Sequence, residues 1–145
     1  MSAHGVPRGV PYNRGRIQQV RNYRGLQYPG GKTPTDVDLV LEYDDEAWII
    51  SELKYMSTAV PGGQRKALAR LCIDLTKCGK PVLCTIASHD APVGCDIQAA
   101  QSLVTEVWDS NEPWTEDKCQ FRPSHRKIVL RDAIDKWLRR EGFHV

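Results

Sequence analysis

Two short runs of apolar residues alternate with polar ones in the first half of the chain. They span Leu39 to Tyr43 and Ala47 to Tyr55, and the acidic segment Asp44-Asp45-Glu46 separates them. Alternate residues of a β-strand point to opposite faces of the sheet, and runs of this length are typical of strands. The pattern therefore predicts two antiparallel strands joined by a tight acidic turn.

One face of the second predicted strand begins apolar and ends charged. The residues on that face are Trp48, Ile50, Glu52 and Lys54. A hairpin pairs the start of its first strand with the end of its second, so Asp38 should lie beside Glu52 and Lys54. Two carboxylates and an ammonium group are costly to remove from water unless they pair or hold a metal. This arrangement predicts a functional site at the open end of the hairpin.

The next part of the chain changes from strand to helix and back. From Gln64 to Lys77 the apolar residues recur at helical spacing, and Gly79 follows as a stop signal. Pro81 to Ala87 is a continuous apolar run, which is typical of a strand buried on both faces. Strand, helix and strand in this order predict a crossover connection that places the third strand parallel to the second.

The C-terminal part predicts one more strand and one more helix. Leu103 to Trp108 reads as the strand, and Asn111 to Pro123 as a loop or an irregular sheet edge. Ile128 to Glu141 has an apolar helical face, with Ser124 as an alternative cap upstream of Val129. Residues 33–145 are thus predicted to form an α/β domain, a small mixed β-sheet flanked by helices.

Charge is distributed unevenly along the chain. The first 32 residues carry six basic residues and no acidic one, whereas the remainder carries fourteen basic and eighteen acidic residues. Basic residues interleaved with tyrosines suit contact with phosphates and stacking on bases, and a flexible solubilising tail is an equally good interpretation. We refer to residues 1–32 as the basic arm. The arm residues that could bind nucleic acid are Arg14, Arg16, Arg21, Arg24 and Lys32.

The bulk composition narrows the class of protein. A chain of 145 residues makes one ordinary domain, and no run approaches the roughly 20 apolar residues of a membrane helix. The five cysteines are odd in number and contain no Cys-x-x-Cys pair. Reduced, mostly buried cysteines and the absence of an apolar leader predict a cytoplasmic protein with no membrane partner.

Asp38, a short spacer and then Glu52-Leu53-Lys54 resemble the signature of the PD-(D/E)XK nuclease superfamily. Gly63 to Leu68 opens the next helix with Gln64, as in several branches of that superfamily, and the helix around Leu130 to Trp137 is similar to that of small phage and bacterial members. The resemblance implies a restriction-endonuclease-like core and a divalent-metal-dependent phosphodiesterase.

The resemblance also assigns roles to residues. Asp38, Glu52 and the backbone carbonyl of Leu53 would hold Mg²⁺ or Mn²⁺, which prefer oxygen ligands and neutralise charge at the phosphate. Lys54 would stabilise the attacking hydroxide or the developing negative charge, and Gln64 would orient water or phosphate near the metal. The competing interpretation of Glu52 and Lys54 is an ordinary surface ion pair.

Asp36 faces the same way as Asp38, and it would either support the metal ligands or be a solvated loop residue. Many members of the superfamily carry an additional glutamate on an N-terminal helix, which adds a metal ligand. This chain has no acidic residue before Asp36, so we expect the metal to have few protein ligands. Arg65 and Lys66 would form either a DNA-facing flank or a solvated helix face.

The expected function is hydrolysis of phosphodiester bonds by a DNA endonuclease, acting on ordinary or branched DNA. DNA is favoured over RNA by the resemblance, and the size suits a homodimer and a phage-encoded enzyme working in the host cytoplasm. The alternative is a weakly active or inactive nucleic-acid-binding module on the same fold, which would use the basic arm.

Overall fold

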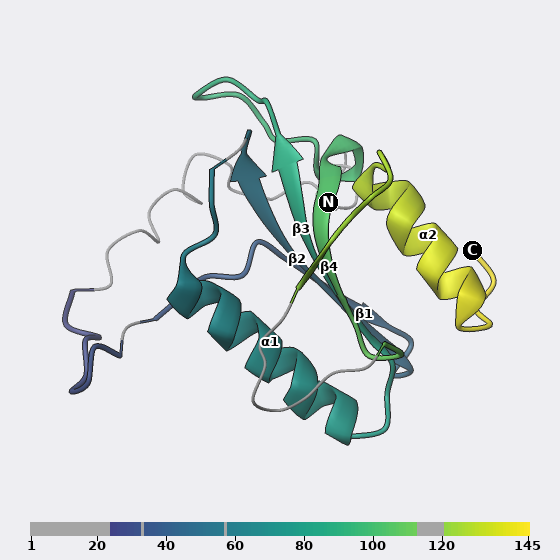
Figure 1. Ribbon diagram of the computed structural model, residues 1–145, viewed down its shortest axis with the longest axis horizontal. Coiled ribbons are helices and arrows are strands. Elements are labelled where there is room, and N and C mark those ends of the chain that lie inside the picture. Colours follow the sequence, from purple (N-terminus) through teal and green to yellow (C-terminus); the bar gives the residue numbers. More distant parts are fainter. Residues whose placement is uncertain (1–23, 33, 57, 113–120) are drawn as a thin grey trace, which may run out of the picture. The chain divides into compact units, whose positions relative to one another are not determined.

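The computed structural model describes residues 24–32, 34–56, 58–112 and 121–145 (Figure 1). The chain divides into two units, Met1–Thr35 and Asp36–Val145. In the described part of the first unit, the Tyr28 amide donates a 2.7 Å hydrogen bond to the Lys32 carbonyl, across a turn with positive φ at Gly30 and Gly31. The arm residues Arg14, Arg16 and Arg21 lie outside the described residues.

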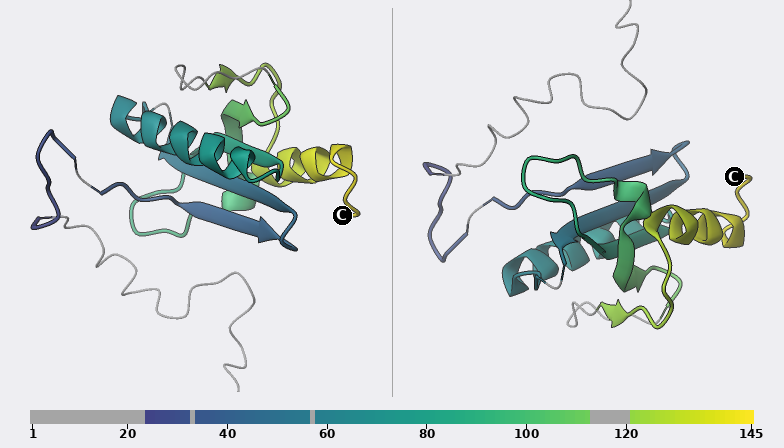
Figure 2. Two further views of the ribbon diagram at one scale, coloured as in Figure 1. Left: turned by 90° about the horizontal axis from the view of Figure 1, so that it is seen from below. Right: turned by 90° about the horizontal axis from the view of Figure 1, so that it is seen from above.

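The second unit is built on a mixed β-sheet. Its described part contains five strands in the order β1-β2-β3-β4-β5. Their bounds are Leu39–Tyr43 (β1), Ala47–Tyr55 (β2), Val82–His89 (β3), Leu103–Asp109 (β4) and Arg122–Pro123 (β5). β3 runs parallel to β2, and the other neighbours are antiparallel. The predicted hairpin and the predicted parallel third strand are both confirmed, and Figure 2 shows the hairpin from two sides.

Two α-helices cover opposite faces of this sheet. Helix α1 (Gly62–Lys77) packs Leu68 against Ile50 of β2, whereas α2 (Leu130–Arg140) packs Trp137 against Ile49. Since Ile49 and Ile50 are consecutive in one strand, their side chains point to opposite faces. The described residues thus form a mixed α/β fold, and they include no helix that is long and apolar enough to cross a membrane.

The beginning of α2 differs from the expectation. The Ser124 hydroxyl donates to the Arg126 carbonyl and does not cap the helix, which begins at Leu130 without any side-chain cap. Val129 instead forms an isolated bridge with β4, and the Leu130 amide donates to the Ser102 carbonyl at 2.8 Å. The residues before α2 are therefore extended because they add to the sheet edge, so the predicted helical start at Ile128 and the alternative cap are wrong.

Smaller differences occur at other boundaries. Helix α1 begins at Gly62, two residues before the predicted start, and β3 continues through His89, two residues beyond the predicted end. A short 3-10 helix, η2 (Ala99–Gln101), precedes β4. The extension of β3 matters for the site, because it carries the sheet past Lys54, whose strand partner is Ser88.

Candidate active site

The hairpin brings Asp38 to the level of Glu52. Leu39 opens β1 opposite Ser51, so Asp38 comes one position before the ladder and Glu52 one position after its partner. The Asp38 Oδ2 atom accepts a 2.8 Å hydrogen bond from the Leu53 amide, in the place where a backbone carbonyl of the preceding chain would accept it if the ladder continued. The predicted proximity of the two carboxylates is thus confirmed.

The Leu53 carbonyl faces the same open edge. Within a strand, the N–H and C=O of one residue point towards the same neighbouring strand. Since the Leu53 amide points to Asp38, its carbonyl also points to the side of β2 on which β1 has not yet begun. The family-implied backbone ligand therefore lies on the same side of β2 as the Asp38 carboxylate.

Glu52 is almost fully buried, although it carries an ionisable group. Its side chain is 2 % exposed, and its Oε1 atom lies 2.8 Å from the Lys54 Nζ atom. Its Oε2 atom is buried without a hydrogen-bond partner among the described residues. A buried polar atom without a partner costs free energy, so it needs an explanation such as a catalytic role or a bound ion. The interpretation of this pair as exposed surface charges is wrong.

The electrostatics of Glu52 reflect this position. Burial is the largest influence and raises the pKa of Glu52, and the nearby negative charge of Asp38 raises it further. The hydrogen bond and charge of Lys54 act in the opposite direction but do not outweigh burial. The Glu52 carboxylate therefore lies in surroundings that favour its neutral form, and an additional positive charge beside it would restore the ionised form.

Gln64 comes from the first turn of α1 and is also buried. Its Nε2 atom donates a long hydrogen bond of 3.4 Å to the Asp36 carbonyl, which links α1 to the chain entering β1. The hydrogen-bonding influence of Gln64 lowers the pKa of Glu52 and is the smallest of the causes that act on it, although Oε2 accepts no well-formed hydrogen bond from any described residue. The side chain of Asp36 itself is exposed.

The donor set consists of oxygen atoms. Glu52 Oε2 and Asp38 Oδ1 have no hydrogen-bond partner in the described part of the chain, and the Leu53 carbonyl faces the same edge. Hard divalent cations such as Mg²⁺ prefer such ligands and keep several waters. No cluster of three or more His, Cys, Asp or Glu side chains occurs among the described residues. Asp38, Glu52 and the Leu53 carbonyl therefore offer the kind of oxygen atoms that a divalent cation takes as ligands.

Arg65, a basic residue in the first turn of α1, is bound by other parts of the second unit. The Arg65 guanidinium forms a two-pronged ion pair with Glu106 of β4, with Nη1 2.6 Å from Oε1, and lies 5.9 Å from the centre of the Phe121 ring. It is therefore held by the protein itself, which argues against the predicted DNA contact. Lys66 is exposed on α1, and Arg24 and Lys32 are exposed in the first unit.

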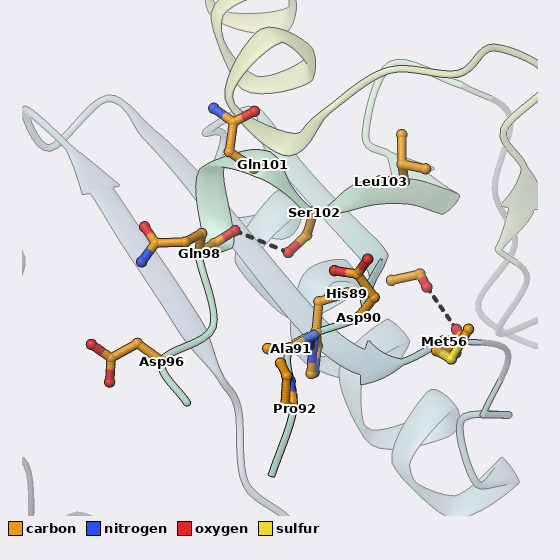
Figure 3. Close-up of a pocket in the computed structure, with 11 residues that line it drawn as sticks. Met56, His89, Asp90, Ala91, Pro92, Asp96, Gln98, Gln101, Ser102 and Leu103 are labelled. Carbon is orange, nitrogen blue, oxygen red and sulfur yellow. Dashed lines mark hydrogen bonds between the residues drawn. The ribbon is translucent and has the colours of Figure 1, made fainter. Parts of the chain in front are cut away.

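A cavity of about 420 Å³ lies where β2 and β3 end (Figure 3). Met56 and His89 line it, and the Met56 amide donates to the His89 carbonyl at 2.7 Å. On the other side, the Ser102 hydroxyl donates to the Gln98 carbonyl at 3.3 Å (Figure 3). The sequence indicates only a loop after a buried strand here, and the cavity depends on η2, which has no clear sequence signal.

In comparisons with known proteins, no family model, no curated protein and no solved structure matched this chain. The functional interpretation therefore rests on the residues and on their geometry.

Proposed function

We propose that this protein is a Mg²⁺- or Mn²⁺-dependent nuclease of the PD-(D/E)XK type, with a restriction-endonuclease-like core, and that it cleaves DNA internally. The observation that carries the proposal is the environment of Glu52. One of its oxygens binds the Lys54 ammonium, the other is buried without a hydrogen-bond partner among the described residues, and the charge of Asp38 acts on the same carboxyl group.

The alternative of a purely structural ion pair explains this environment poorly. Exposed pairs of this kind are common and contribute little to stability. Glu52, however, is buried, so its carboxylate loses the water that would otherwise solvate its charge, and this loss costs free energy. Lys54 compensates for only one of the two carboxylate oxygens. If the Glu52 carboxylate binds a cation in the functional state of the protein, the cation would be the partner of the second oxygen, Oε2.

Each residue has a distinct role in the proposed reaction. Asp38, Glu52 and the Leu53 carbonyl would hold the cation, which neutralises charge at the phosphate and makes bound water a better nucleophile when it is present. Lys54 places a positive charge on the face of β2 that also carries Glu52. There it would stabilise the negative charge that develops on the phosphate. Gln64 is a positioning residue, which joins α1 to the chain before β1. Hydrolysis would be direct, without a covalent intermediate.

Cleavage of supercoiled plasmid and of a four-way junction, in Mg²⁺, Mn²⁺ or EDTA, tests the proposal. The variants Glu52→Gln and Lys54→Ala should abolish metal-dependent cutting. The matched controls Glu42→Gln and Lys80→Ala change the same residue types in the hairpin and in the turn before β3, and they should keep it. Cutting that survives in Glu52→Gln and in Lys54→Ala would refute the proposed site.

A second candidate is a nucleic-acid-binding module without cleavage. It is favoured by one observation, the lack of a third acidic, histidine or cysteine ligand among the described residues. Such a module should tolerate Glu52→Gln, and it should lose affinity and salt dependence when Arg14, Arg16 and Arg21 are neutralised. Salt-sensitive DNA binding with no cutting in any metal would favour this candidate over the nuclease.

A further inference from the structure

A second cavity, of about 520 Å³, lies between α2, β4 and the residues that join β5 to α2; we refer to it as the α2 cavity. Leu83 and Trp137 line it, and both pack on the face of the sheet that Ile49 covers. Glu52 lies on the opposite face, with Ile50. The α2 cavity is therefore separate from the candidate active site, and its volume is in the range of cavities that hold small molecules.

Basic side chains surround the α2 cavity. They are Arg122, His125, Arg126, Lys136 and Arg140, and Asp109 is the one acidic residue among the described lining residues. Lys136 and Arg140 are four residues apart in α2, so they lie on the same side of the helix. Side chains from two separate segments thus place positive charge around one hollow.

Two of these positive charges are not balanced within the described residues. Arg140 forms an ion pair with Asp109, whose Oδ1 atom also accepts from the Asn111 amide, and Arg122 forms an ion pair with Glu112 at 2.6 Å. Arg126 and Lys136 make no ion pair with any described acidic residue. A phosphate monoester carries close to two negative charges at neutral pH, which matches these two side chains.

Trp137 borders the α2 cavity and has a buried N–H group without a hydrogen-bond partner among the described residues. Its side chain is 4 % exposed. Buried indole N–H groups usually find a hydrogen-bond partner, because an unpaired donor loses its water without compensation. Trp137 therefore reports, through this N–H group, on changes in the wall of the α2 cavity.

Part of the remaining wall of the α2 cavity is apolar. Val104 and Val107 of β4, Leu83 of β3 and Ile128 contribute to it. An apolar wall next to a pair of cations suits a molecule with a flat ring and a charged phosphate. We propose that the α2 cavity binds a nucleotide through its 5′-phosphate, with the phosphate at Arg126 and Lys136 and the base against the apolar wall.

The proposal does not depend on the nuclease activity, since none of the nuclease residues lines the α2 cavity. The 5′-phosphate could belong to a free nucleotide or to the end of a DNA strand. Both sources present the same phosphate monoester, and the experiment separates them.

The test follows the Trp137 indole N–H resonance in ¹H–¹⁵N spectra of the full chain, assigned with Trp137→Phe. Thymidine 5′-monophosphate should shift this resonance on saturable binding, and thymidine should bind at least ten-fold more weakly. Pentathymidylate with and without a 5′-phosphate forms the second arm. If the phosphorylated strand binds as tightly as the mononucleotide, the site takes a strand end; if it does not, the site takes the free nucleotide.

A charge-matched pair of variants supplies the control. Arg126→Gln with Lys136→Gln should weaken binding at least ten-fold. Arg131→Gln with Arg139→Gln removes the same charge from α2 residues that do not line the cavity, and it should leave binding unchanged. Glu52→Gln should also leave it unchanged.

Three results would overturn the proposal. They are equal loss of binding in both double variants, binding that leaves the Trp137 resonance unmoved, and inorganic phosphate or thymidine binding as tightly as the nucleotide. The same spectra report whether each variant is folded.

Discussion

Replacement of Glu52 by glutamine should stabilise the protein while it abolishes the proposed activity. The substitution keeps the size of the side chain and an oxygen that can accept from Lys54, but it removes a negative charge that is 98 % shielded from solvent in the folded state. Stability gained at the expense of function is typical of residues that are retained for catalysis or binding.

The expected gain is modest, because opposing effects partly cancel. Burial of a single charge costs several kcal/mol, but the Lys54 ammonium recovers part of that loss, and glutamine leaves a buried N–H₂ group in the place of Oε2. We therefore expect an increase of about 1 kcal/mol in the free energy of unfolding, in the range of other single stabilising substitutions. For a domain of this size that corresponds to about 4 °C in the melting temperature.

The gain should depend on pH in a defined direction. Burial raises the pKa of Glu52 in the folded state, so the folded protein holds this proton at pH values where the unfolded chain has released it. Stability contributed by this group therefore falls as the pH rises from the ordinary glutamate pKa through the raised one. The advantage of Glu52→Gln should be full above the raised pKa and vanish below about pH 4.

Thermal and urea unfolding in EDTA, at pH 4 and at neutral pH, measures this difference, and Glu42→Gln serves as the exposed control with a change within about 0.5 kcal/mol. Addition of Mg²⁺ or Mn²⁺ at neutral pH should raise the melting temperature of the wild type but not of Glu52→Gln, because only the folded wild type binds the cation. A Glu52→Gln variant that is less stable than the wild type at neutral pH would refute the reasoning and make the Glu52–Lys54 pair structural.

Three further predictions concern the scaffold. Arg65→Ala should lower the free energy of unfolding by about 1 kcal/mol, because its ion pair with Glu106 is partly exposed. A double-mutant cycle of Arg65 and Glu106 in urea measures the coupling between the two side chains, and no measurable coupling would contradict this prediction. Leu68→Ala should cost about 2–5 kcal/mol in urea unfolding, since the side chain is fully buried between α1 and the sheet, and a smaller loss would mean that the core closes over the gap. Lys80→Ala should return the pKa of Asp45, which the Lys80 hydrogen bond and charge lower, towards its ordinary value in carboxylate NMR titrations, and an unchanged pKa would show that the pair does not form in solution.

The elements that the sequence predicts well are those with a local pattern. The bounds of β1 and β2 agree with the alternation of apolar residues, and the uninterrupted apolar run of β3 indicates a strand buried on both faces. β5 has no such pattern, because its two residues are extended only through pairing with Glu106 and Val107 of β4. The start of α2 is missed for a related reason, since Val129 is held in the extended state by a bridge to Leu103.

The candidate site shows the same division. The proximity of Asp38 and Glu52 follows from hairpin register, which the sequence determines through the length of the turn. The engagement of Arg65 could not be foreseen, since its partner Glu106 lies 41 residues away in β4. Nor does sequence alone show that Glu52 keeps one oxygen without a partner, because this depends on how α1 closes over the end of β2.

One local event connects the fold to the proposed chemistry. The β1–β2 ladder ends at Leu39 because the side chain of Asp38, and no backbone carbonyl, accepts from the Leu53 amide. This hydrogen bond holds the Oδ2 atom of Asp38 in place. The Oδ1 atom remains at the edge of β2, on the side to which the Leu53 carbonyl points. On the face towards α1, Glu52 adds a buried oxygen that has no hydrogen-bond partner in the described part of the chain. A sheet selected for stability alone would continue the ladder and fill this position with an apolar side chain. The start of β1 at Leu39 thus leaves these oxygens at the sheet edge, where the proposed cation site would use them.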